Sequence, residues 1–180
     1  MIDVSERTGA DREQLIQEVY RRGYELEQRY YGCAQCVVGA IQDFFPLNNA
    51  VFKAATSFSG GIASSIEGTC GALSGGIMVL SYFFGRPREE FSDISLLRRP
   101  GPLVQEYWDM FREKYQGETC REVQNCFFGT AYRFLDNDEY YEYEKKGGHK
   151  DVCPAVVAEA SAWLAEKLID RKVPILKNKP

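Results

Sequence analysis

Cysteine is the residue type that offers this chain the most chemistry, because six cysteines occur among its 180 residues. Four of the six stand at predicted helix starts, each in a different part of the sequence. Four thiolates gathered around one centre are the ligand set of a tetrahedral zinc ion or of an iron–sulfur cluster. We call this set the helix-start cysteines: Cys33, Cys70, Cys120 and Cys153.

A helix N-terminus offers unpaired amide donors and the positive end of the helix dipole. Both lower the pKa of a thiol toward the thiolate that binds metals or attacks disulfides. Any one of these cysteines could instead be a small buried apolar residue. Four in one chain favour a shared site, so we expect the helix-start cysteines to be metal ligands and Cys36 and Cys126 to be neighbours or core residues.

Two other readings of the thiols remain open. Cys33 and Cys36 are three residues apart and would share a helix face, so a metal-free thiol–disulfide oxidoreductase could pair Cys33 with Cys36 or Cys70. A structural zinc module is the other reading, although zinc ribbons and fingers use two closely spaced ligand pairs, whereas long helical segments separate the helix-start cysteines. The single histidine, His149, follows two glycines and is expected at the surface.

Composition narrows the class of protein. The length fits a single domain over residues 1–180, with loose termini expected at 1–10 and 173–180. No export signal is recognisable at the start, which predicts a cytoplasmic, soluble protein with reduced thiols. The net charge is −4 without a basic patch, so nucleic acid is not an expected partner. No apolar run is long enough for membrane insertion.

Apolar spacing predicts an all-α fold, an irregular bundle of about five helices with glycine-rich links. Residues 120–132 are ambiguous between helix and extended chain, residues 136–149 are expected to form an exposed arm, and residues 85–102 a surface connection. The clearest helical patterns lie at 11–29, 33–45, 69–80, 103–115 and from 151 onward.

The helix that follows Cys70 contains several glycines, each of which weakens a helix by roughly 1 kcal/mol relative to alanine. Gly71 and Gly75 lie about one turn apart and would give the helix a flat face. Another backbone or a bulky cofactor could lie against this face, so we expect these two glycines to bind the cofactor.

Several motifs together resemble a known family. They are residues 32–38 around Cys33, the turn at 57–62, the Cys-Gly-Ala-x-x-Gly element at 70–75, Cys120-Arg-Glu-Val and Cys153-Pro. In this order they resemble the redox-active protein family named for its C_GCAxxG_C_C pattern, over about residues 31–168. The family cysteines fall on the helix-start cysteines.

The resemblance also implies a cofactor. A domain of this type is similar to part of the split-Soret cytochromes c, which implies a [2Fe–2S] type of iron–sulfur cluster held by the helix-start cysteines. No Cys-x-x-Cys-His is present, so covalent haem is not implied. We therefore expect an electron-transfer protein with a redox partner protein; whether the chain forms a homodimer is left open.

Overall fold

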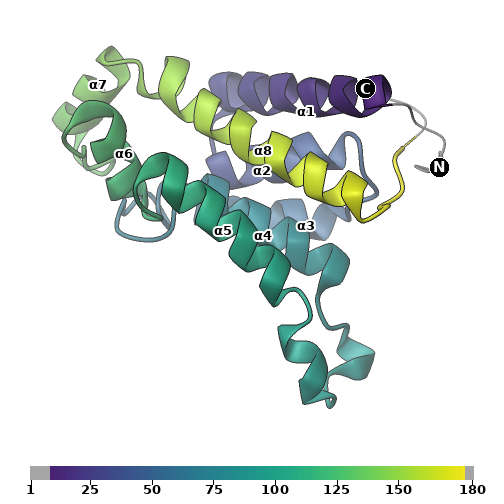
Figure 1. The fold of residues 1–180 in the computed structure, drawn as a ribbon. Helices are drawn as coiled ribbons and strands as arrows, with labels where there is room; N and C mark the ends of the chain where they lie inside the picture. The colour runs from purple at the N-terminus through teal and green to yellow at the C-terminus, as the bar shows by residue number, and fades with distance from the viewer. Residues whose placement is uncertain (1–8, 177–180) are drawn as a thin grey trace.

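The computed structural model describes residues 9–176 and is built from helices (Figure 1). The described part of the chain contains no strand, and an isolated bridge joins Thr69 and Thr119, so the predicted all-α class is confirmed. The α-helices are α1 (Gly9–Tyr30), α2 (Cys33–Gln42), α3 (Asn49–Ala54), α4 (Gly71–Phe84), α5 (Gly101–Tyr115), α6 (Cys120–Phe128), α7 (Asn137–Lys145) and α8 (Cys153–Asp170).

These eight helices correct the predicted count of about five. The three short ones, α3, α6 and α7, each begin at a capping side chain. Asn48 and Asp136 accept hydrogen bonds from backbone amides of the first turn, and Thr119 forms a capping box with Glu122. Such caps stabilise helices too short to show a clear apolar stripe, so periodicity alone underestimates their number.

The core lies between two helix pairs, since α8 packs mainly against α1 and α2 mainly against α4. Leu15 and Val19 from α1 meet Val157 and Leu164 from α8 in one apolar cluster that also includes α2 and α4. Helices α6 and α7 gather with the beginning of α8 at one end, left in Figure 1. No helix in the described part of the chain is long and apolar enough to span a bilayer.

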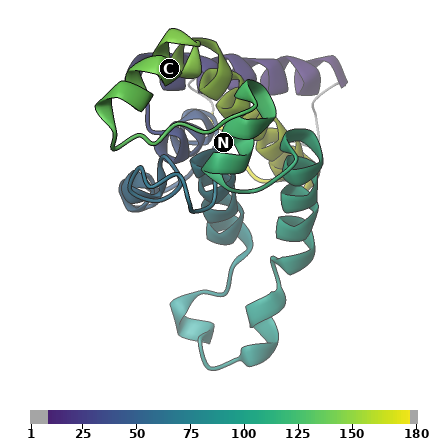
Figure 2. The same ribbon diagram turned by 90° about the vertical axis from the view of Figure 1, so that its left-hand side faces the viewer.

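The connection between α4 and α5 projects from the bundle (Figures 1 and 2). It was expected at the surface, and it is there: Phe91, Ile94 and Leu97 are all exposed. It also contains two short 3₁₀ turns, Arg88–Glu90 and Ile94–Arg98.

The chain ends are more ordered than expected where they are described. Gly9 and Ala10 belong to α1. Val173 and Ile175 are buried, and the Leu176 amide donates to the Phe44 carbonyl at 2.9 Å, so residues 173–176 are not a loose tail. The rest of the predicted loose termini, 1–8 and 177–180, lies outside the described residues.

Candidate functional site

Four helix N-termini deliver the helix-start cysteines to one cavity of about 390 Å³. Cys33, Cys120 and Cys153 are the first residues of α2, α6 and α8, and Cys70 is the cap immediately before α4. Their predicted placement at helix starts is confirmed. All four are free thiols that line this cavity, so the fold gathers residues from distant parts of the sequence.

A short backbone pairing aligns two of these thiols. The Cys70 amide donates to the Glu118 carbonyl at 2.7 Å, and the Cys120 amide donates to the Gly68 carbonyl at 3.1 Å. The beginnings of α4 and α6 are thereby joined at the bridge between Thr69 and Thr119. The pairing holds Cys70 and Cys120 next to each other independently of any bound group.

Close approach of α2 and α4 explains the two glycines that sequence analysis assigned to cofactor binding. A Cβ atom on Gly71 would lie 2.2 Å from the Cys33 sulfur, and one on Gly75 would lie 2.6 Å from the Ala34 carbonyl oxygen. Neither glycine lines the cavity itself, although the Gly71 amide donates to the Cys33 sulfur. Their flat face therefore receives helix α2 and positions Cys33.

A left-handed turn forms another wall. Five consecutive residues, 60–64, have φ between 50° and 68°, although only the first two are glycine. Gly61 must be glycine for space as well, because a Cβ there would lie 2.8 Å from the Cβ of Cys120. The turn brings the Gly60 amide to the Cys33 sulfur. Left-handed conformation is costly for the other residues and is characteristic of functional sites.

Hydrogen bonds make Cys33 the most acidic of the four thiols. The Cys70 thiol donates to Cys33, and with amides of Gly60, Ala34 and Gly71 it lowers the pKa of Cys33 to about 7 against the effect of burial. The same hydrogen bond raises the pKa of Cys70. Near neutral pH Cys33 is therefore the thiol of this pair that ionises, while Cys70 stays protonated.

The remaining two thiols are held protonated in the absence of a metal. Burial raises the pKa of Cys120 to about 12. Burial and the nearby Glu27 raise the pKa of Cys153, which also exchanges a 2.8 Å hydrogen bond with the Tyr143 hydroxyl. Such thiols can bind a metal only when the metal displaces their protons, which are released to solvent.

Cys36 and Cys126 lie outside the cavity. The Cys36 thiol donates to the Tyr31 carbonyl at 3.0 Å and lines a separate pocket, and burial raises its pKa. Cys126 is exposed on α6. The structure therefore places Cys70, and not Cys36, beside the acidic Cys33 in the cavity.

Sequence analysis missed Glu27. This glutamate is 1 % exposed and lines the cavity, and its Oε2 atom has no hydrogen-bond partner among the described residues. Burial raises the pKa of Glu27 well above the usual range. A signal existed, because position 27 continues the buried stripe of Leu15, Val19 and Gly23 at intervals of four residues. A carboxylate on the buried face of a helix is a candidate for function.

His149 and the tyrosines near it correct two expectations. His149, expected at the surface, has a side chain only 12 % exposed and lines the cavity from a π-helical turn, Gly148–Val152. Residues 136–149, expected as an exposed arm, contain the fully buried Tyr143. Two aromatic rings of α7 and one from the chain just before it line one side of the cavity. They belong to Tyr140, Tyr143 and Phe134.

Comparison with known proteins matches the sequence that forms this site to one family. The sequence model described as "Putative redox-active protein (C_GCAxxG_C_C)" matches residues 31–167, which include all four helix-start cysteines and most of the chain. Searches of curated proteins and of solved structures found no match.

Proposed function

The chain belongs to the redox-active protein family named for the C_GCAxxG_C_C pattern, and from this premise we propose that it is an electron-transfer protein with an iron–sulfur cluster. The ligands are the helix-start cysteines. The observation that carries the proposal is their convergence: four free thiols, each at a separate helix N-terminus, line one cavity. Family membership supports the redox role, and the donor set supports this cofactor.

The spacing of the thiols favours a cluster over a single zinc ion. Four sulfurs on one tetrahedral zinc lie about 3.8 Å apart, given bonds of about 2.3 Å. Among the described residues, no three of these thiols have sulfur atoms that all lie within 4.8 Å of one another. A [2Fe–2S] cluster, which spreads its four cysteines over two irons, suits a wider set of sulfurs.

The chain's own residues would tune such a cluster. A cluster held by the helix-start cysteines would supply one-electron transfer between a donor and a partner protein, with no covalent bond made or broken. Amides of Gly60, Ala34 and Gly71 that donate to the Cys33 sulfur stabilise negative charge and raise the reduction potential. Apolar and aromatic walls limit the access of water to the sulfurs.

The test is an anaerobic preparation of the full chain. We expect stoichiometric iron and acid-labile sulfide, with visible absorption that bleaches on one-electron reduction. Serine in place of any helix-start cysteine should lower the iron content severely, whereas Cys126→Ser, which changes an exposed thiol, should not. A colourless chain with free thiols after anaerobic iron and sulfide reconstitution contradicts the proposal, as does one tightly held zinc ion.

One observation favours a second function, thiol–disulfide exchange. Cys33 has a pKa lowered to about 7, and the thiol that lowers it, Cys70, is its hydrogen-bond partner. The Cys33 thiolate would attack a disulfide of the partner protein, and Cys70 would then displace the partner from the mixed disulfide. Two electrons and two protons pass to the partner, which leaves as a dithiol while Cys33 and Cys70 form a disulfide.

A redox titration separates the two functions. Exchange predicts a two-electron couple that survives strong chelators and is lost in Cys70→Ser. The cluster predicts a one-electron couple that disappears with the iron.

A further inference from the structure

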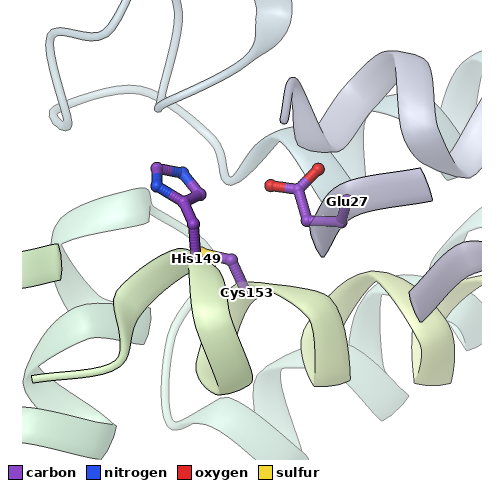
Figure 3. A group of neighbouring side chains, drawn as sticks. All are labelled: Glu27, His149 and Cys153. Carbon is purple, nitrogen blue, oxygen red and sulfur yellow. The ribbon is translucent and has the colours of Figure 1, made fainter. Parts of the chain in front are cut away.

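A second group of metal donors lies in the same cavity and includes two residues outside the family pattern. The ligand atoms of Glu27, His149 and Cys153 all lie within 4.8 Å of one another. Glu27 reaches from α1 toward His149, in the π-helical turn before α8, and toward Cys153, the first residue of α8 (Figure 3). Donors on one tetrahedral ion are about 3.3 to 3.8 Å apart, so small side-chain movements would complete the site.

His149 is already oriented as a ligand. Its Nδ1 atom forms a hydrogen bond with the Glu144 carboxylate, and in a neutral imidazole this bond places the proton on Nδ1 and leaves the Nε2 lone pair for a metal. Metal-binding histidines typically have such a carboxylate behind them. The rings of Tyr31 and Tyr143 lie 4.5 Å and 5.1 Å from the imidazole and restrict its rotation.

Glu27 supplies an independent sign of a missing partner. The side chain is almost completely buried, the residue lines the cavity, and its Oε2 atom has no hydrogen-bond partner among the described residues. A buried carboxyl group normally has a partner for each oxygen. A cation between Glu27 and His149 would provide that partner and would balance the charge of an ionised carboxylate.

We propose that Glu27, His149 and Cys153 bind a zinc ion, with the fourth coordination position open to the cavity. One oxygen, one nitrogen and one sulfur donor suit zinc, and three protein ligands with an open position are typical of zinc sites that accept water or a small ligand. Cys153 also belongs to the helix-start cysteines. The zinc ion and the cluster therefore compete for one sulfur, and this competition rests on the proposed function, whereas the zinc site itself does not.

The test measures zinc affinity in the reduced, metal-free full chain by competition with a chromophoric chelator. We expect Glu27→Gln and His149→Gln each to weaken binding at least about tenfold, and Glu144→Gln, which removes only the orienting carboxylate, to weaken it by a smaller factor. Cys126→Ser is the control, since it removes an exposed cysteine outside the cavity and should leave zinc affinity unchanged.

X-ray absorption of the zinc-loaded wild-type chain provides a readout that does not depend on how the variants fold. One sulfur and two nitrogen or oxygen neighbours from the protein support the proposal. Four sulfur neighbours, or affinity unchanged in both Glu27→Gln and His149→Gln, overturn it. Iron and sulfide loading of His149→Gln is measured separately: normal loading with weakened zinc binding supports both proposals, and failed loading of the wild-type chain counts against the cluster alone.

Discussion

At the residue scale, the cavity gives chemically identical cysteine side chains different thiol pKa values. Cys33 receives hydrogen bonds from a thiol and three amides, whereas Cys120 and Cys153 are buried without comparable stabilisation of the thiolate. This difference in thiol pKa does not follow from position at a helix start, because all three cysteines begin a helix. Hydrogen bonding to the charged form therefore decides which thiol ionises first.

Cys33 should titrate near neutral pH in the reduced, metal-free chain. Its pKa is lowered to about 7 from a reference of 9.0, so the thiolate predominates above pH 7. Because the pKa of Cys33 is lower in the folded chain, its thiolate stabilises the folded state at pH values above the unfolded pKa. This contribution is lost as the pH falls through the folded pKa of about 7.

Nuclear magnetic resonance of ¹³Cβ-labelled cysteine would follow this ionisation, since the shift reports protonation even in a buried side chain. The Cys120 signal should stay that of a thiol over the same range, because burial raises its pKa to about 12. In Cys70→Ala the Cys33 midpoint should move upward, since its first hydrogen-bond donor is gone. A Cys33 midpoint near 9 in the wild-type chain would contradict the assignment.

At the element scale, close packing and strained backbone position the thiols. Glycines lower the intrinsic helix propensity of α4, but they leave the space in which α2 packs closely against it. The turn at 60–64 is similarly left-handed. This conformation brings the Gly60 amide to the Cys33 sulfur and Gly61 against Cys120. Local preferences are overridden where the cavity is built.

Gly75→Ala should destabilise the chain by about 1–3 kcal/mol despite the better helix propensity of alanine. The added Cβ would lie 2.6 Å from the Ala34 carbonyl oxygen, and α2 would have to move, taking Cys33 with it. Gly101→Ala is the matched control, because a Cβ at this helical position meets nothing within 4 Å. Chemical denaturation of both variants measures the difference; equal stability would show that α2 and α4 are not tightly packed here.

Ala63→Gly should stabilise the chain by about 0.5–1 kcal/mol. Ala63 is exposed at φ 50°, so glycine relieves left-handed strain without removing a buried contact. The gain is partly offset by the greater freedom of glycine in the unfolded chain. Thermal unfolding of this variant beside Ala54→Gly, which is exposed in the right-handed α3, gives the comparison; destabilisation by both substitutions would contradict the strained turn.

At the scale of the whole molecule, sequence patterns predict the helical class and the four thiols but not the complete cavity. The helix-start cysteines could be predicted because helix starts have local signals. Glu27 was not predicted: it lies on an amphipathic helix rich in charge, and its burial depends on α8 packing against α1. The burial of His149 likewise depends on rings that only the folded chain brings together.

Removal of the proposed cluster should loosen one end of the molecule and spare the other. The cavity lies where the beginnings of α2, α4, α6 and α8 meet, whereas the apolar cluster around Leu15 and Leu164 lies along α1 and α8. Hydrogen exchange followed by mass spectrometry should show lost protection in peptides around the helix-start cysteines. Peptides from the middle of α1 and α8 should keep theirs, and uniform loss of protection would argue against a locally built site.

The convergence of four separate helix starts has a consequence for the order of biosynthesis. Cys153 begins α8, the last helix of the described chain, so the donor set stays incomplete until nearly all of the described residues have been translated. Nascent chains that stop within α7 carry three of the four thiols and lack the helix that packs against α1. Binding of the proposed cluster would therefore have to wait until the start of α8 has been made and α8 has packed against α1.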